Sequence, residues 1–286
     1  MNLPGRREGW PEGRAKLSVV IPCYDSVDFL VETVDSLRVQ DLADTEVIFV
    51  DDGSRDDTVG LIKWIMGSSP ACAMRLIEQP NAGLAGARNT GIAAAHGRYV
   101  LPLDADDLIV NGMLARFVDV LDSEPGVDMV YGDREDFGDV AGIQRSGRFE
   151  LSRLKYFNQL PYCAMYRRSL WQKAGGYQTN VSGLDDWNFW IATSSAGAVA
   201  RHVPDVFFRH RRRRSSQLWS LLSRYEAIYS QIVLNNAACY SREEVDAAEL
   251  HLREGMPSRV ASLSRMLFLK FYYRSYEGEG GCACWW

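Results

Sequence analysis

The sequence has little of what a disulfide-stapled or zinc-bound fold needs. Its 286 residues include six cysteines and four histidines. Apart from Cys282 and Cys284 the cysteines are scattered, and no group of cysteines and histidines has the spacing of a zinc site. This pattern favours a reducing, cytoplasmic location.

Long apolar runs are missing as well. No stretch of about 18 apolar residues occurs, which is the length that a membrane-spanning helix requires. Residues 1–16 are charged and rich in Gly and Pro, and they lack the apolar centre of a signal peptide. We therefore expect neither an export signal nor a membrane span.

Neither sign of charge dominates the chain. The formal net charge of -5 is spread along the sequence, so overall electrostatics favour neither nucleic acid nor membrane as a partner. The exception is the segment FFRHRRRR at 207–214. A hydrophobic content of 47% is enough for a full core, and we expect a globular domain of enzyme size.

Apolar runs and helical patterns alternate in the first half of the chain. We predict strands at 17–22, 45–54, 74–79, 98–107 and 126–133, and helices at 26–40, 57–66, 81–97 and 113–121. This alternation implies right-handed crossovers and a mostly parallel sheet covered on both faces. The predicted fold class is α/β.

Polar residues follow each of the first four predicted strands. In a parallel sheet the carboxyl ends of the strands share one edge, and ligands bind there. We therefore expect one site formed by Tyr24, Asp25, Asp51, Asp52, Asn81, Gly83 and Asp104 to Asp107.

Five segments follow one another in a specific order: VVIPCYDSVDFLVETVDSL, VIFVDDGSRDDT, NAGLAGARNTGI, LDADD and GLDDWNFW. Together they resemble the family 2 glycosyltransferases of the GT-A fold, over roughly residues 17 to 210. The resemblance implies a Rossmann-like, mostly parallel sheet flanked by helices. It also implies inverting transfer of a sugar from a nucleotide diphosphate to an acceptor hydroxyl, with Mn²⁺ or Mg²⁺ as cofactor.

The resemblance also suggests how the chain is divided. We expect a flexible segment at 1–16, a catalytic domain at 17–215, and a helical extension with a tail at 216–286. Within the catalytic domain, we expect a nucleotide-binding part at 17–133 and an acceptor part at 134–215. Segment 134–150 is polar and contains glycine, which is typical of a loop or hairpin.

The crowded carboxylates of LDADD need a positive partner, because like charges at this spacing repel each other. The resemblance makes Asp104 and Asp106 a DxD pair, with Asp106 the direct metal ligand and Asp104 near the ribose and the metal. A cation that bridges two phosphates neutralises the charge on the leaving group. Asp107 is the weaker candidate. Alternatively, Asp106 and Asp107 cap a following helix.

The resemblance assigns the base of the nucleotide to residues after the first two strands. Asp51 would hydrogen-bond the base, consistent with a uracil imide and therefore with a UDP-sugar. Pro22 and Tyr24 form a P-x-Y element whose aromatic ring packs on the base, although a half-buried aromatic at a strand end is an alternative for Tyr24. Asp25 stands where the family commonly has Asn, and it adds a negative charge.

The segment NAGLAGARNTGI matches the family pattern N-x-G-x-x-x-A-R-N. The resemblance places Asn81 and Gly83 at the nucleotide, since glycine lets the backbone come close to a ligand. Arg88 is the strongest candidate of this segment, because a guanidinium can reach phosphate or base. For Asn89 a role in holding the turn is the alternative.

The segment GLDDWNFW supplies a second acid group. Transfer to a hydroxyl needs a carboxylate on the face opposite the leaving diphosphate. The resemblance makes Asp186 this base and places Asp185, which replaces the usual Glu, against the acceptor. The alternative is that one of the two caps the helix ahead of Trp187.

The basic segment carries two further predictions. The resemblance makes His210 a third metal ligand, whereas a structural histidine is the alternative. The arginines could bind diphosphate or an anionic acceptor. They could also contact anionic lipids at the inner face of a membrane through Arg209, Arg211, Arg212, Arg213 and Arg214.

Other functions remain open at this point. A haloacid-dehalogenase-type phosphohydrolase has D-x-D after a strand but a different continuation from the Leu108 found here, and a sugar nucleotidyltransferase usually has a Gly-rich, basic segment where this chain has PCYDS. A catalytically inactive GT-A protein and a basic module for membranes or polyanions are further alternatives. The favoured partners are a nucleotide-sugar donor and a glycan or lipid-linked acceptor in polysaccharide or cell-envelope synthesis, without nucleic acid.

Overall fold

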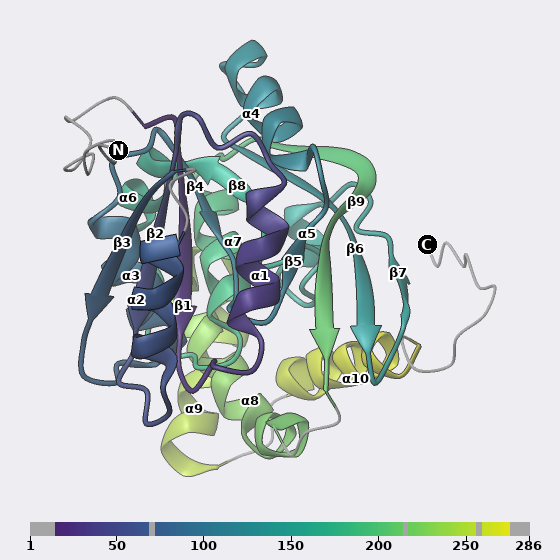
Figure 1. Ribbon diagram of the computed structural model, residues 1–286. Coiled ribbons are helices and arrows are strands. Elements are labelled where there is room, and N and C mark those ends of the chain that lie inside the picture. The colour runs from purple at the N-terminus through teal and green to yellow at the C-terminus, as the bar shows by residue number, and fades with distance from the viewer. Residues whose placement is uncertain (1–14, 69–71, 214–216, 256–258, 275–286) are drawn as a thin grey trace, which may run out of the picture.

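The computed structural model describes residues 15–68, 72–213, 217–255 and 259–274. Strands and helices alternate in the first part of the chain, as predicted: β1 (Leu17–Cys23), α1 (Leu30–Arg38), β2 (Thr45–Asp51), α2 (Thr58–Ser68), β3 (Ala73–Glu78), α3 (Gly83–Ala93) and β4 (Tyr99–Pro102). β1 pairs in parallel with β2 and β4, and β2 pairs in parallel with β3 (Figure 1). The first four strands and the first three helices of the prediction are confirmed.

The following part of the chain completes the sheet. It contains β5 (Leu108–Ile109), α4 (Met113–Ser123), β6 (Met129–Gly138), β7 (Gly142–Gln144), α5 (Leu151–Leu154), β8 (Met165–Arg167), α6 (Arg168–Ala174), α7 (Asp185–Ser195) and β9 (Ala200–Arg212). The strand order is β3-β2-β1-β4-β8-β6-β9-β5, with β7 paired to β6. β6 and β7 are antiparallel neighbours, so the expected hairpin exists as far as Gln144, but residues 134–138 also belong to the main sheet because they pair with β9.

The sheet is mixed rather than parallel throughout. β8 lies between β4 and β6 and runs antiparallel to both, and β5 runs antiparallel to β9. The expectation of a parallel sheet thus holds for β1 to β4 and for the β6–β9 pair. The alternation of strands and helices that predicts parallel pairing stops near residue 133, and β8 and β9 lie beyond that point.

Helices cover both faces of the sheet because alternate residues of its central strands point in opposite directions. Val19 of β1 packs in a cluster with buried residues of α1, α2 and α4. The next residue, Val20, packs in a second cluster with α3 and α7. Figure 1 shows α1 and α2 in front of the sheet. The burial of β1 and β2 on both faces explains their continuous apolar sequence.

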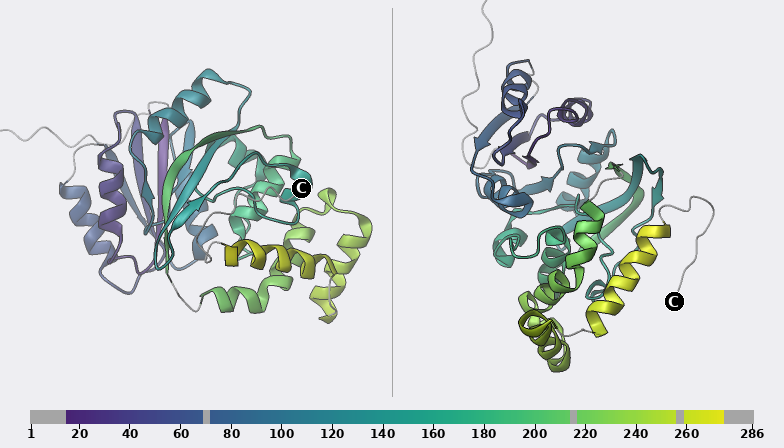
Figure 2. Two further views of the ribbon diagram at one scale, coloured as in Figure 1. Left: turned by 90° about the vertical axis from the view of Figure 1, so that its right-hand side faces the viewer. Right: turned by 90° about the horizontal axis from the view of Figure 1, so that it is seen from below.

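Three further helices follow the sheet: α8 (Gln217–Asn235), α9 (Arg242–Glu254) and α10 (Arg259–Arg274). They gather on one side of the molecule, away from α1 and α2 (Figure 2). Their buried side chains, such as Tyr229 and Ala248, belong to the same cluster as α3 and α7. The predicted helical extension therefore shares the core of the sheet. The predicted boundary at 215/216 lies outside the described residues.

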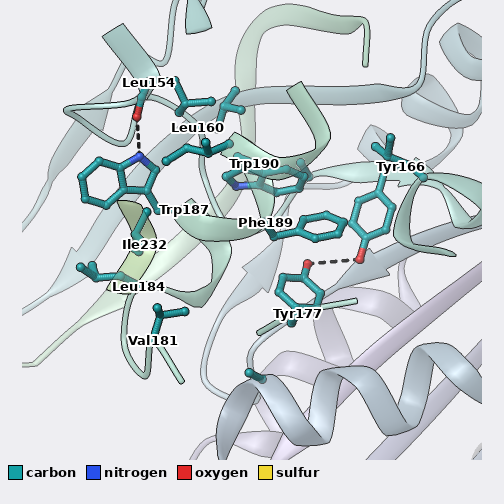
Figure 3. Close-up of a cluster of buried hydrophobic side chains, with 14 of the residues drawn as sticks. Leu154, Leu160, Tyr166, Tyr177, Val181, Leu184, Trp187, Phe189, Trp190 and Ile232 are labelled. Carbon is teal, nitrogen blue, oxygen red and sulfur yellow. Dashed lines mark hydrogen bonds between the residues drawn. The ribbon is translucent and has the colours of Figure 1, made fainter. Parts of the chain in front are cut away.

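The shared core is rich in aromatic side chains (Figure 3). The indole N–H of Trp187 donates to the carbonyl of Leu154 at 2.6 Å. The hydroxyls of Tyr166 and Tyr177 lie 3.2 Å apart. Both tyrosine rings also pack on Phe189, so these contacts fix α7, which carries the predicted base, against its surroundings.

In the described part of the chain, no helix combines the length and apolar character that a membrane crossing requires.

Candidate active site

The polar segments after the first four strands lie at one edge of the sheet, as predicted. Cys23, at the end of β1, is in register with Asp51 of β2, which is in register with Glu78 of β3. Beyond β4, the N–H of Leu103 donates to the carbonyl of Val20 at 2.9 Å. The loops after β1, β2, β3 and β4 therefore begin side by side.

Asp51 and its neighbour Asp52 have different surroundings. Asp51 is 4% exposed, and its Oδ2 accepts a hydrogen bond from the N–H of Ser54 at 3.2 Å. Its Oδ1 has no hydrogen-bond partner among the described residues. Asp52 instead accepts from Gln79 at 2.7 Å and from the N–H of Ala82 at 2.8 Å. Asp51 thus offers an acceptor to a ligand, whereas Asp52 holds the loop after β3.

That loop presents Asn81 and Gly83 at the surface. Gly83 has a φ of +76°, a conformation that is open to glycine and unfavourable for most other residues. A Cβ at this position would have no neighbour within 4 Å. The glycine therefore serves the turn into α3, and the space above it is open.

The loop after β1 explains why Asp25 can stand in place of Asn. Its φ is +47°, in the left-handed region that Asn and Asp enter more readily than other non-glycine residues. Asp25 Oδ1 accepts from the N–H of Arg55 at 2.7 Å. The guanidinium of Arg55 lies over the ring of Tyr24 and donates to its hydroxyl. The loops after β1 and β2 are thereby tied together, and Tyr24 remains 38% exposed.

Pro22 fits the end of β1. β4 pairs with β1 only as far as Val20, so no neighbour on that side requires the N–H that proline lacks.

The positive partners of the crowded carboxylates are arginines. The Nη2 atom of Arg88 lies 2.7 Å from Oδ1 of Asp104, and the Nη2 atom of Arg213 lies 2.8 Å from Oδ2 of Asp106. β4 ends at Pro102, so both aspartates lie in a loop rather than in the predicted strand at 98–107. We call this loop, residues 103–107, the DAD loop.

Asp107 fixes the end of the DAD loop through a buried side chain. It accepts hydrogen bonds from the hydroxyl of Tyr162 at 2.5 Å and from the N–H of Arg211 at 2.7 Å. Burial, together with the charges of Asp104 and Asp106, raises the pKa of Asp107 well above its usual range. Tyr162 also accepts from the N–H of Asp104 at 3.1 Å. The capping alternative is wrong, because the two-residue strand β5 follows Asp107 rather than a helix.

Arg88 joins the DAD loop to α7. Besides Asp104, it contacts Asp185, whose Oδ2 lies 2.8 Å from Nη1. The guanidinium is 2% exposed and lies over the rings of Tyr162 and Tyr177, with distances to the ring centroids of 5.0 and 5.7 Å. Burial alone would lower the pKa of Arg88, but the charges of Asp104 and Asp185 outweigh it and raise the pKa well above its usual value. A contact between Arg88 and phosphate stays a prediction, since two of its nitrogens already bind carboxylates.

Asp185 and Asp186 are the first two residues of α7, where the helix dipole favours negative charge. The capping position belongs to Leu184, and no side chain caps the helix, so the capping alternative is wrong here too. Asp186 is half-buried, and its Oδ2 accepts from Asn158 at 3.1 Å. Burial and the charge of Asp185 raise the pKa of Asp186 to about 6. A carboxylate with this pKa is a suitable proton acceptor near neutral pH.

His210 lies in β9, and its ring centroid is 6.4 Å from that of Tyr162, which contacts the DAD loop. Its Nδ1 is 3.2 Å from Oδ1 of Asp136, and Arg134 contacts the same oxygen at 3.0 Å. Burial lowers the pKa of His210, which favours the neutral ring. A metal-binding histidine often has a carboxylate at its other nitrogen, and Asp136 has this position at Nδ1 of His210. The assignment of His210 as a metal ligand stays a prediction.

The carboxylates of the DAD loop fit only a particular kind of metal site. Among the described residues, no three His, Cys, Asp or Glu side chains form a group that could hold a metal ion. Mg²⁺, however, is commonly held by one or two carboxylates together with the phosphates of a substrate, and Mn²⁺ has the same preference for oxygen. Asp104 and Asp106 are each about a quarter exposed and supply such a pair. They fit a cation that arrives with a diphosphate.

The arginines of β9 face carboxylates of this chain. Arg209 pairs with Glu135 at 3.0 Å, and Arg211 pairs with Glu32 at 2.6 Å. Arg212 also has an interaction partner, and Arg214 lies outside the described residues. These pairs connect β9 to β6 and to α1. Contact with a membrane through this segment stays a prediction.

Sequence reasoning missed Tyr162 and Asn158 and proposed no specific contact for Arg213. Tyr162 lies in an apolar run, and Asn158 lies in a segment without regular pattern. Their partners are between 28 and 107 positions away in the sequence. The basic run was the only signal, and it marked Arg213 as one of several equivalent arginines.

Comparison with known proteins defines the class. The model of "Glycosyl transferase family 2" matches residues 18–181. A PGL/p-HBAD biosynthesis glycosyltransferase of Mycobacterium bovis is 31% identical over 197 residues, which are 65% of this chain and 73% of that protein. The chain therefore belongs to glycosyl transferase family 2. It spans less than a third of the length of the chondroitin and hyaluronan synthases that it also matches.

Solved structures with the same fold agree with this class. S. aureus TarS 1-349 in complex with UDP-GlcNAc is similar with a TM-score of 0.61 at 18% identity, covering 92% of this chain and 90% of that one. The mannosyltransferase PcManGT from Pyrobaculum calidifontis, in complex with GDP-Man and Mn²⁺, has a TM-score of 0.60 at 22% identity, covering 95% and 86%. The fold is thus that of the GT-A glycosyltransferases.

Proposed function

We propose that the protein transfers a sugar from a nucleotide diphosphate, with UDP favoured, to an acceptor hydroxyl with inversion at the anomeric carbon. The observation that carries the proposal is the double contact of Arg88 with Asp104 and Asp185. It holds the predicted donor-binding loop and the predicted base helix next to each other. A transferase needs this arrangement, because donor and acceptor must meet in a single site.

The donor would lie along the edge formed by the loops after β1 to β4. Asp51 offers its unpartnered oxygen to the base, Tyr24 offers an exposed ring, and Asn81 lies on the open surface before α3. TarS, a protein of the same fold, is known with UDP-GlcNAc, which supports UDP. PcManGT is known with GDP-Man, so the test of the base includes GDP-sugars.

Asp186 acts as the base in this proposal. Its carboxylate takes the proton of the acceptor hydroxyl while the oxygen attacks the anomeric carbon from the face opposite the diphosphate. Asp104 and Asp106 would hold Mn²⁺ or Mg²⁺, which supplies positive charge for the departing diphosphate. Asp185, fixed by Arg88, keeps the start of α7 in place and its charge raises the pKa of Asp186.

The acceptor class follows from relatives rather than from residues. Chondroitin and hyaluronan synthases and a PGL/p-HBAD biosynthesis glycosyltransferase match this chain. We therefore propose a glycan or lipid-linked acceptor in polysaccharide or cell-envelope synthesis. A lipid-linked acceptor would bring a cytoplasmic enzyme to the inner face of a membrane.

Replacing the proposed base tests the reaction directly. Asp186→Asn should lower kcat by about 10²- to 10⁴-fold, which is the usual contribution of a general base. The variant should bind the nucleotide diphosphate as the unchanged protein does, because Asp186 does not face the nucleotide. Transfer would be measured with UDP-, dTDP- and GDP-sugars in the presence of Mn²⁺ or Mg²⁺. Unchanged transfer by the variant would show that another group takes the proton, and no metal-dependent turnover of any donor would favour an inactive GT-A protein.

A further inference from the structure

We propose that Arg213 stands at Asp106 in place of the metal ion, and that it moves to the diphosphate when donor and cation bind. This inference rests on the proposed function. It gives Arg213 two successive partners: a carboxylate of the DAD loop before donor and cation bind, and the leaving group during the reaction.

The pair between Arg213 and Asp106 is suited to exchange. Their nitrogen and oxygen are 2.8 Å apart, and their side chains are 54% and 26% exposed. An exposed pair of this kind contributes little stability, because water screens it and two side chains must be held in place. A divalent cation carries twice the charge of a guanidinium and would replace it at the carboxylate.

The neighbouring Arg211 has a different task. Its Nε donates to the carbonyl of Asp106 at 3.0 Å, and its guanidinium also contacts Glu32 at 2.6 Å. Arg211 is therefore tied at several points, and it holds the backbone of the DAD loop. Arg213 reaches the same loop through the carboxylate of Asp106. It can leave without releasing the loop.

Phe29 keeps Arg213 within reach of the site. The guanidinium groups of Arg213 and Arg211 lie over this ring, with distances to the centroid of 4.8 and 4.9 Å. Phe29 directly precedes α1, at the edge of the sheet where the donor would bind. A guanidinium released from Asp106 would remain at that edge, next to the diphosphate.

The charge balance of transfer gives Arg213 its second partner. As the acceptor oxygen bonds to the anomeric carbon, the bond from that carbon to the β-phosphate oxygen breaks. The electron pair of the broken bond goes to the diphosphate, and the acceptor proton goes to Asp186. The diphosphate thus gains one negative charge in the transition state. Arg213 brings one positive charge, as a guanidinium that pairs well with phosphate oxygens.

The first test measures Mn²⁺ binding to the protein without nucleotide. Arg213→Gln removes the competing guanidinium, so we expect Mn²⁺ to bind about three- to fivefold more tightly than to the unchanged protein. Arg209→Gln is the matched control, because it removes the same charge from the same basic segment at a side chain that pairs with Glu135. The free Mn²⁺ would be followed by electron paramagnetic resonance.

The second test measures nucleotide binding at saturating Mn²⁺. Arg213→Gln should weaken UDP by about tenfold, the usual effect of losing one charge-assisted hydrogen bond, and leave UMP unchanged because it has no β-phosphate. Arg209→Gln should match the unchanged protein with both nucleotides. GDP with GMP, or dTDP with dTMP, would replace the uridine pair if the unchanged protein selects that base.

The outcomes separate this inference from the proposed function. If the unchanged protein binds none of the three diphosphates with Mn²⁺, the proposed function fails and the inference fails with it. If it binds one of them and Arg213→Gln behaves like Arg209→Gln in either test, the inference alone is overturned.

Discussion

At the scale of single residues, the site depends on side chains whose charge is set by their neighbours. Asp186 is the clearest case, since burial and the charge of Asp185 raise its pKa to about 6. The hydrogen bond from Asn158 opposes this shift, because it favours the charged carboxylate. Asp185 and Asn158 thus act in opposite directions on the pKa of Asp186, and this pKa sets the pH range in which Asp186 can accept a proton.

The pKa of Asp186 and its hydrogen bond from Asn158 lead to a prediction about the pH dependence of the reaction. A base must be deprotonated, so kcat/KM should fall as the pH drops below about 6, the value for Asp186. Asn158→Ala removes a hydrogen bond that lowers the pKa, so the acid limb should move to higher pH by about one unit. Asn180→Ala is the control, because Asn180 pairs with Asn235 at the surface. Identical acid limbs in both variants would argue against Asn158 as a positioning residue for the base.

Sequence patterns predicted the residue types of the site better than their partners. Asp51 and Asp104 were predicted as site residues because they follow predicted strands, and Asp186 was predicted from the segment GLDDWNFW. The partners of these residues were not predicted, since contacts such as Asp107 with Tyr162 join side chains 55 positions apart. The electrostatic argument asked for a positive partner of the DAD loop, and it did not foresee that Arg88 of α3 and Arg213, which follows β9, fill this place.

At the scale of elements, α3 packs unusually close to the sheet. A Cβ at Gly91 would approach Val20 of β1 more closely than atoms can, and it would lie 3.0 Å from Val50 of β2. This close packing places Arg88, one turn earlier on α3, beneath the DAD loop. Gly91 thus sets how close α3, which carries Arg88, lies to the sheet.

Substitution of this glycine should destabilise the fold. Gly91→Ala is expected to lower the free energy of unfolding by about 1–3 kcal/mol, because the added methyl group overpacks the contact with β1. Gly67→Ala is the matched control, since a Cβ at Gly67 in α2 has no neighbour within 4 Å and alanine favours helix by up to about 1 kcal/mol. Urea denaturation would measure both. Equal stability of the two variants would mean that α3 can shift away from the sheet at little cost.

The sequence predicted these elements where a regular pattern exists. The alternation of apolar strands and helices up to residue 133 predicted β1 to β4, the first part of β6 and the helices between them, with ends that differ by a few residues. β8 and β9 escaped prediction for physical reasons. β8 has three residues, and β9 contains Pro204 and ends in a basic run, beside a partner, β6, that is far away in sequence. Pairing between distant strands, rather than local propensity, determines their place.

At the scale of the whole molecule, one buried ion-pair network connects the two halves of the chain. Arg88 belongs to the first half, and Asp185 to the second. Such a network is costly to break on one side, because it leaves buried charges without a partner. Arg88 therefore adds a polar connection to the one that the shared sheet and core already make between the halves.

Removing Arg88 tests the connection. Arg88→Ala should lower the free energy of unfolding by about 3–5 kcal/mol, since Asp104 and Asp185 lose their shared partner. Arg116→Ala is the control: its pair with Asp205 is about half exposed, so its loss should change stability by at most about 1 kcal/mol. Thermal or urea unfolding would compare the two variants. A similar small effect for both would mean that water can take over the role of the guanidinium at this site.

The contacts of Arg88 with Asp104 and Asp185 also limit which chimeras with related proteins can fold. A chimera that grafts the acceptor part of a relative onto this nucleotide-binding part inherits an arginine that needs a carboxylate at the start of the grafted helix and two tyrosine rings around it. Exchanging loops at the rim leaves this requirement untouched. New acceptor preferences are therefore more accessible through such loops than through transplantation of whole segments.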